Sequence, residues 1–174
     1  MERHAGFIAL LVVGGVIALI VSRSVDSQGR VVIGGAFDAR PPVVVTGDGA
    51  IGQLLIPQHF SGSYLTEVTI SGTPIEVMVD TGASYFTLRE SDAIRAGINP
   101  PSAAPRREFR TANGTVTARQ AGPVSVQLGP TRLDDVTVYV LADDRLGISL
   151  LGMNVLNRFQ AFSFSDRGLI IDVN

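Results

Sequence analysis

The stretch Val77-Met78-Val79-Asp80-Thr81-Gly82-Ala83-Ser84 places one carboxylate at the end of an apolar, Val-rich run. Apolar residues resume directly afterwards with Tyr85, Phe86 and Leu88. A charge between two buried strands costs free energy unless something holds it and uses it. Asp80 is therefore the first candidate for a functional residue, and the alternative is an ordinary turn or helix-cap Asp in a β-domain.

Composition limits the classes of protein and of site. The chain has 174 residues, 45% of them hydrophobic, which suits one domain of ordinary size with extra segments. Its net charge of −2 predicts no basic face and no nucleic-acid partner. There is no Cys, and the two His, His4 and His59, lie far apart, so we expect no metal site and no cofactor. Catalysis is left to Asp and Glu, because motifs of serine hydrolases, zinc proteases and P-loop enzymes are absent from the sequence.

The N-terminus carries an uncharged run over residues 5–22, and about 18 residues is near the lower limit for a membrane span. We predict a retained transmembrane helix over residues 1–23. A cleaved signal peptide is the alternative, although Ser22-Arg23-Ser24 is a poor cleavage site, and a buried core helix is a third. The short tail before the run favours an N-terminus inside and the remainder exported, as a single-pass inner-membrane protein with its domain in the periplasm.

Residues 24–53 show no helical period and carry many Gly, Ser, Asp and Pro residues. This composition predicts a flexible linker between the membrane and the folded domain. The alternative is that Val31-Val32-Ile33 and Val43-Val44-Val45 are short strands added to that domain.

Residues 54–174 carry the pattern of a mainly β domain. Alternation over residues 63–70, a turn at residues 71–73 and an apolar run over residues 75–79 predict a hairpin that ends at Asp80. Asn113-Gly114 between two strand-like runs predicts a second hairpin. Further strands are expected at residues 87–88, 124–128, 136–140, 161–165 and 169–173, and short helices at residues 90–97 and 153–159. Glu90 and Asp92 are interpreted as first-turn acids of the first helix.

Three features of this domain resemble the retropepsin-like aspartic proteases, and more closely the membrane-anchored bacterial aspartyl proteases among them. They are Asp80-Thr81-Gly82-Ala83 after an apolar strand, the Asn113-Gly114 hairpin, and Leu150-Leu151-Gly152-Met153-Asn154-Val155-Leu156 near the end. The resemblance implies a closed acid-protease barrel of one lobe with one or two short helices.

The resemblance also implies the roles of particular residues. Asp80 would be catalytic, with Thr81 bonding across two active-site loops, Gly82 leaving room for substrate and Ala83 completing the loop. Ala112, Asn113 and Gly114 would form the tip of a flap that closes over substrate. Leu151 and Gly152 would support the active loop, because glycine permits a close approach of two backbones.

Peptide hydrolysis by this route needs two carboxylates that share one proton around a water. The chain has one Asp in the required setting, since Asp134-Asp135 and Asp143-Asp144 lack a following Thr-Gly or Ser-Gly. We therefore expect a homodimer in which the second carboxylate is Asp80 of another copy. The C-terminal strand that ends at Asn174 would contribute to an interchain sheet, as in the retroviral relatives.

Two details adjust that expectation. Ala83 cannot hydrogen-bond the carboxylate as a Ser would, so we expect a pH optimum at mild acidity or neutrality. Retroviral members commonly have an Arg at the position of Met153, in an ion pair that supports the dimer. Here other contacts must stabilise the dimer.

The sequence thus predicts a membrane-tethered aspartic endopeptidase, a hydrolase acting on protein or peptide substrates through paired Asp80 carboxylates. The alternative is a non-catalytic peptide-binding or assembly module that kept the fold. The intact Asp80-Thr81-Gly82 favours the enzyme, because a binding module has no need of a desolvated carboxylate there.

Overall fold

The computed structural model describes residues 40–45, 52–111 and 114–173, and the backbone of four short strands before them. Those strands are β1 (Leu10–Val13), β2 (Val16–Leu19), β3 (Arg23–Val25) and β4 (Val31–Ile33), with β1 paired to β2 and β3 to β4. The predicted transmembrane helix falls partly on β1 and β2 and otherwise outside the described residues. Within the described part, no helix has the length and apolar character needed to cross a membrane.

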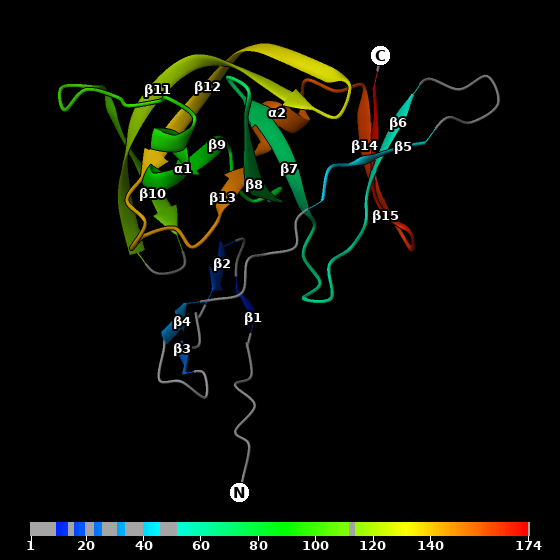
Figure 1. The fold of residues 1–174 in the computed structure, drawn as a ribbon, viewed down its shortest axis with the longest axis horizontal. Helices are drawn as coiled ribbons and strands as arrows, with labels where there is room; N and C mark the ends of the chain where they lie inside the picture. The colour runs from blue at the N-terminus through cyan, green and yellow to red at the C-terminus, as the bar shows by residue number, and fades with distance from the viewer. Residues whose placement is uncertain are drawn as a thin grey trace, which may run out of the picture.

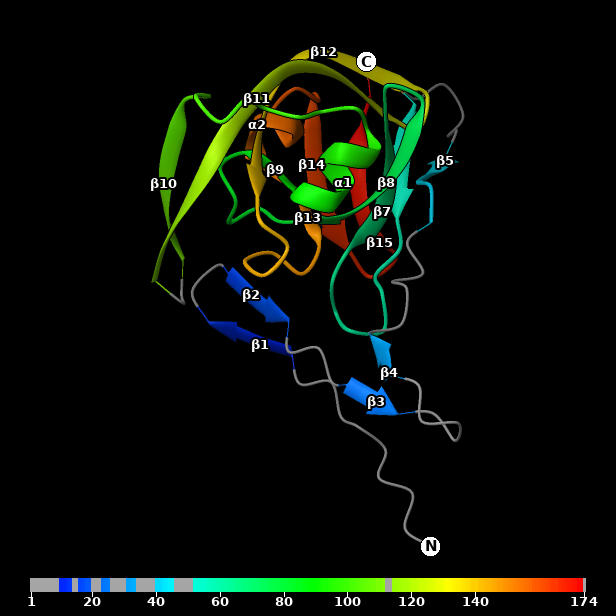
Figure 2. The ribbon, with the colours of Figure 1, turned by 60° about the vertical axis from the view of Figure 1, so that its left-hand side comes forward.

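The main sheet closes on itself. Its strands are β7 (Leu65–Ile70), β8 (Thr73–Val79), β9 (Phe86–Arg89), β10 (Arg106–Thr111), β11 (Gly114–Leu128), β12 (Thr131–Leu141) and β13 (Ser149–Leu151). They run in the order β10-β11-β12-β9-β13-β8-β7, and β7 pairs back onto β11. The two long strands β11 and β12 arch over the barrel in Figures 1 and 2, with β10 paired to the outer side of β11. The predicted mainly β, closed barrel is confirmed.

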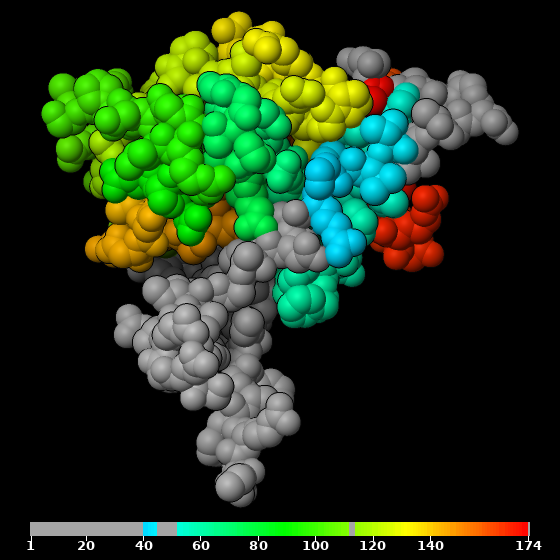
Figure 3. Space-filling view, viewed as in Figure 1, coloured from blue at the N-terminus to red at the C-terminus, as the bar shows by residue number. Residues whose placement is uncertain are grey.

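A second sheet lies beside the barrel (Figures 1 and 3) and contains β5 (Val43–Val45), β6 (Gln53–Ile56), β14 (Ala161–Ser165) and β15 (Gly168–Asp172). Its order is β14-β15-β6-β5. Val43–Val45 is thus a strand of the folded domain, and Arg40 forms a β-bridge with Thr66. Strand pairing therefore begins before residue 54, the predicted start of the domain. Both edges of β15 are paired within the described chain, so β14 and β5 are the edge strands of this sheet, and the predicted interchain sheet stays a prediction.

The core lies inside the barrel and between it and the second sheet. Alternate residues of each strand face inward, and Phe86, Leu88 and Leu151 are completely buried. The predicted hairpin of β7 and β8 turns at Ser71 and Gly72, whose φ angles of 51° and 80° match the primed turns that suit tight hairpins.

Two short helices are present among the described residues, close to where the sequence predicts them. They are α1 (Glu90–Arg95), which follows β9 directly, and α2 (Met153–Leu156), which follows β13. Gly97, with φ of +73°, lies just after the first helix, as expected for a helix stop. α1 therefore continues β9, the strand that the Asp80 loop enters, and α2 continues β13, which lies between β8 and β9 in the sheet.

Candidate active site

Strand β8 delivers Asp80 to the loop that follows it. Strand β13 pairs in parallel with β8, with Leu151 opposite Val79, and the Asp80 N–H donates to the Leu151 carbonyl at 3.1 Å. The sequence prediction that Asp80 ends a buried strand is confirmed.

The Asp80 carboxylate is half-buried and is held by backbone donors of its own loop. Its Oδ1 accepts a hydrogen bond from the Gly82 N–H at 2.8 Å. Burial raises the pKa of the Asp80 carboxyl above its ordinary range, and backbone hydrogen bonds from Gly82 and Ala83 oppose that rise. A carboxyl whose pKa is raised by burial suits a group that exchanges protons during a reaction.

Gly152 supports the loop through a close backbone contact. A Cβ at this position would lie 2.5 Å from the Tyr85 carbonyl oxygen and 2.7 Å from that of Ala83. The following residues bond the same loop, since the Met153 N–H donates to Ala83 at 2.8 Å and the Asn154 N–H to Ser84 at 3.1 Å. The geometry agrees with the predicted loop-supporting role of Gly152, because the space admits no side chain.

Asn154 is a supporting residue that sequence reasoning missed. Its Oδ1 accepts from the Phe86 N–H at 2.7 Å, and its Nδ2 donates to the Thr137 carbonyl at 2.8 Å. One side chain thus ties the exit of the active loop to β12. The available sequence signal was an amide inside a short helix that is otherwise apolar.

Thr81 and Gly82 are exposed in this single chain, and Ala83 is half-buried. The loop therefore presents an open face beside the carboxylate. That face is available to a substrate or to a second protein chain.

The predicted second hairpin is formed by β10 and β11, which pair from Arg106 opposite Arg119 to Thr111 opposite Gly114. The predicted flap residues Ala112 and Asn113 lie outside the described residues. Gly114, with φ of +105°, begins β11, and its carbonyl accepts from the Thr111 hydroxyl at 2.7 Å.

Three aromatic rings join this hairpin to the active loop. Tyr85 lies just after the loop, Phe109 is on β10 and Tyr139 is on β12. Ring centroids are 6.1 Å apart for Tyr85 and Phe109, 5.0 Å for Tyr85 and Tyr139, and 5.1 Å for Phe109 and Tyr139, all edge to face. Such pairs add to the free energy of burial, so the hairpin is anchored beside the Asp80 loop.

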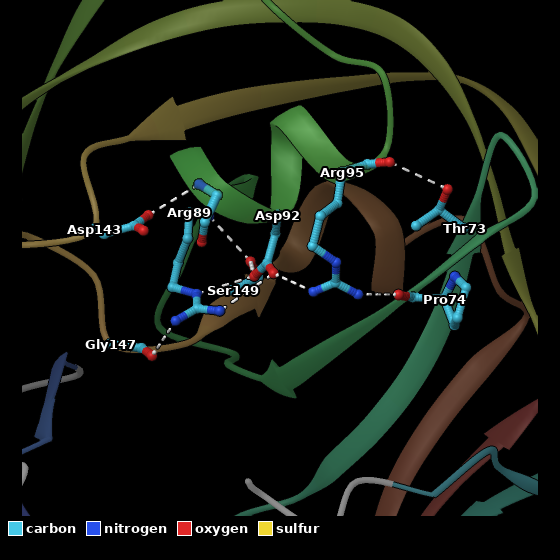
Figure 4. A network of polar contacts seen from close by, with 9 residues as sticks. Thr73, Pro74, Arg89, Asp92, Arg95, Asp143, Gly147 and Ser149 are labelled. Atoms are coloured by element: carbon cyan, nitrogen blue, oxygen red, sulfur yellow. Dashed lines mark hydrogen bonds and ion pairs between the residues drawn. The ribbon is translucent and has the colours of Figure 1, made fainter. Parts of the chain in front are cut away.

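A second carboxylate, Asp92 of α1, is buried and fully engaged (Figure 4). Arg89 donates to it from one side at 3.0 Å and Arg95 from the other at 2.9 Å, and the Ser149 hydroxyl donates at 2.7 Å. Burial alone would raise the pKa of Asp92, but the hydrogen bonds from Arg89 and Ser149 and the charges of both Arg residues hold it below its ordinary range. The interpretation of Asp92 as a plain first-turn acid is therefore incomplete, since it ties α1 to β13.

Asp143 and His59 are engaged with other parts of the described chain. Asp143 accepts from the Ser91 N–H at 3.0 Å, and His59 bonds Ser61 at 2.8 Å in the loop before β7. Residues 40–45, 52–111 and 114–173 contain no group of three or more His, Asp or Glu that is placed to hold a metal ion.

Comparison with known proteins agrees with this geometry. The family described as gag-polyprotein putative aspartyl protease matches residues 66–158, more than half of the chain. The crystal structure of a retropepsin-like aspartic protease from Rickettsia conorii is 31% identical in sequence, with a TM-score of 0.61 over 71% of this chain and 92% of that one.

Two curated relatives are uncharacterized proteins. One, from a Sinorhizobium species, is 29% identical over 87% of this chain, and one from Rickettsia prowazekii (strain Madrid E) is 33% identical over 70%. The chain spans 65% and 51% of their respective lengths. The matched region contains the Asp80 loop, the β10–β11 hairpin and the Gly152 segment, and the chain belongs to the retropepsin-like aspartic protease family.

Proposed function

We propose that this chain is a membrane-tethered aspartic endopeptidase that acts as a homodimer, with Asp80 of each copy forming the catalytic pair. The observation that carries the proposal is the single half-buried carboxylate at the end of β8, held by Gly82 and braced by Leu151 and Gly152. This geometry is costly to maintain for a carboxylate that does no chemistry.

The chemistry requires a second carboxylate. One ionised Asp takes a proton from water while a protonated Asp polarises the scissile carbonyl. Asp92 is buried and is bound by Arg89 and Arg95 inside the protein. It therefore cannot be the second catalytic carboxylate beside Asp80. Asp80 of a second copy supplies the missing group, and the exposed Thr81 and Gly82 supply the face on which the two loops would meet.

Substrate would lie between the active loop and the β10–β11 hairpin as an added extended strand. β10 is an edge strand of the main sheet in the described chain, and the hairpin stands beside the loop through Phe109 and Tyr85. Backbone pairing then holds the peptide, and side-chain pockets select it. The hairpin tip around Asn113 and Gly114 is the proposed flap.

Tethering rests on the uncharged run of residues 5–22. In lipid, a two-stranded hairpin leaves outer backbone groups without partners, so insertion of this run requires a helix. We place the N-terminus inside and the protease domain in the periplasm. Alkaline extraction of membranes, with and without residues 1–23, tests this part separately: release of the complete chain by alkali would contradict it.

The catalytic proposal is tested with Asp80→Asn in the 174-residue chain, against a broad set of quenched fluorescent peptides between pH 3 and 8. Asp166→Asn, in the turn between β14 and β15, is the matched control because it removes the same charge from an exposed position. We expect Asp80→Asn to lower kcat/KM by a factor on the order of 10³ or more, and the control to leave it unchanged.

Sedimentation of the same samples tests the dimer. Equal cleavage by the wild type and Asp80→Asn would contradict the catalytic role. A dimeric wild type that binds peptides and cleaves none would favour the binding or assembly module.

A further inference from the structure

A guanidinium stands where the active loop and the proposed flap meet. The Cζ atom of Arg107 on β10 lies 4.8 Å from the centroid of the Tyr85 ring and 5.9 Å from that of Phe109. Its Nη1 donates to the Tyr85 hydroxyl at 3.0 Å. The side chain is exposed although its guanidinium is fixed in place by these two rings.

The face of β10 that carries Arg107 is the face toward Tyr85 and the exit of the active loop. Side chains alternate along a strand, so Arg107, Phe109 and Thr111 share one side, while Arg106, Glu108 and Arg110 share the other. Phe109 contacts Tyr85 and Tyr139, which places that shared side against the exit of the active loop. Arg107 therefore borders the channel in which the proposed substrate strand would lie.

The guanidinium of Arg107 has no carboxylate partner among the described residues. None of the ion pairs among those residues includes it, and Glu108, its acidic neighbour, points to the opposite side of the strand. The hydrogen-bond partners of Arg107 are the hydroxyls of Tyr85 and Tyr139, which leaves the other N–H donors of the guanidinium unused. These donors form a fork that matches a carboxylate.

The surrounding hairpin is basic in a chain that is acidic overall. Residues 106–119 contain four Arg and one Glu, whereas the whole chain has a net charge of −2. Arg119 is paired with Glu90 at 2.5 Å, which leaves the positive field concentrated on β10. Such a local field attracts acidic ligands and repels basic ones.

We propose that Arg107, held over Tyr85, is a specificity-determining residue that binds an acidic side chain of the peptide substrate. The inference rests on the proposed protease function. The substrate class is a peptide with Asp or Glu at a fixed distance from the scissile bond. In a two-fold dimer there are two Arg107 side chains, one on each side of the axis, so the preference falls at equivalent positions before and after the cleaved bond.

The alternative role of Arg107 is to stabilise the fold alone, by stacking on Tyr85. A stacking role affects all peptides alike and affects thermal stability. A specificity role changes the ratio between acidic and neutral peptides, so the two roles separate experimentally.

The test scans a peptide that the wild type cleaves, placing Glu, Gln or Arg at each position on both sides of the bond. It compares wild type, Arg107→Gln, Arg107→Glu and Arg106→Gln, the last removing the same charge from the other face of β10. At the two equivalent positions, we expect wild type to prefer Glu over Gln by roughly three- to tenfold in kcat/KM at low salt. Arg107→Gln abolishes this preference, Arg107→Glu reverses it toward Arg, and Arg106→Gln retains it.

The outcomes distinguish the two proposals. If wild type cleaves no peptide, the protease function fails. If wild type cleaves Glu and Gln peptides equally, or if Arg107→Gln lowers both rates by the same factor, the protease stands and the specificity inference is overturned. Added salt should reduce the Glu preference, because the paired charges are exposed to solvent.

Discussion

Two carboxylates of the same region, Asp80 and Asp92, have opposite environments. Asp92 is 2% exposed and accepts hydrogen bonds from two Arg side chains and Ser149. Asp80 is half-buried, its carboxylate is held by backbone N–H groups, and no ion pair among the described residues includes it. Their pKa values accordingly move in opposite directions, downward for Asp92 and upward for Asp80.

The difference separates a structural acid from a reactive one. A neutralised, fully bonded carboxylate fixes α1 to β13 and is not available for proton exchange. A half-buried carboxylate with no cation beside it keeps its proton more readily and stays accessible. The β13 strand joins the two, because Ser149 bonds Asp92 and Leu151 bonds the Asp80 backbone.

The largest expected effect on stability comes from Asp92→Asn. Removing the buried carboxylate leaves Arg89 and Arg95 without their shared partner. Because these two Arg side chains are 32% and 53% exposed and can be rehydrated, we expect a loss of about 3 kcal/mol in the free energy of unfolding, the low end for a buried pair. Chemical denaturation measures this loss. Asp80→Asn is the comparison variant and should leave the free energy of unfolding nearly unchanged; equal losses in both would remove the distinction between the two acids.

Gly152→Ala is expected to be next in size. A Cβ there meets backbone atoms of Ala83 and Tyr85, which forces the active loop to shift and costs roughly 1–3 kcal/mol, with a fall in kcat. Gly52→Ala is the control, because its Cβ would meet only a side-chain atom of Val173 at 3.1 Å. Normal stability and normal kcat for Gly152→Ala would contradict the role of Gly152 in supporting the Asp80 loop.

Asn154→Ala should lower the free energy of unfolding by about 1–3 kcal/mol, because the Phe86 N–H and the Thr137 carbonyl both lose their hydrogen-bond partner. Asn154→Asp keeps the acceptor for Phe86 and loses the donor to Thr137, so it should retain part of the stability. Thermal unfolding of both variants ranks them. If Asn154→Asp and Asn154→Ala unfolded at the same temperature, the hydrogen bond to Phe86 would contribute little to stability.

The smallest effect is a difference in pH dependence. The lowered pKa of Asp92 contributes stability that is present above its unfolded pKa of about 3.9 and is lost as pH falls through the folded value. The raised pKa of Asp80 acts with the opposite sign, since its ionisation costs stability as pH rises above about 3.9. The free energy of unfolding of Asp80→Asn should therefore be slightly higher than that of the wild type at neutral pH and equal to it in acid. Chemical denaturation at a series of pH values measures this difference.

Local signals were enough to predict much of the fold and of the site. The Val-rich run before Asp80, the turn at Ser71 and Gly72 and the Asn113-Gly114 hairpin each depend on neighbours in sequence. Gly152 was found through its place in the family motif. Contacts between residues far apart in the sequence could not be predicted in this way. The hydrogen bond from Asn154 to Thr137 of β12 and the ring contact of Phe109 with Tyr85 form only when the barrel closes.

The misjudged features have the same cause. Asp92 carries the ordinary signature of a first-turn helix acid, and its burial depends on Ser149 far along the chain. Val43–Val45 lies in a Gly- and Pro-rich segment, yet it pairs with β6 because that strand has an open edge.

The central claim, that one active site is built from two copies of Asp80, is tested most directly by mixing wild type with Asp80→Asn under conditions that exchange subunits. At equal amounts, random pairing leaves roughly a quarter of the dimers fully wild type, so activity per wild-type chain should fall to about half. It should fall further as the variant is added in excess, while Asp166→Asn has no such effect. Activity per wild-type chain that stays constant at every ratio would contradict the shared site.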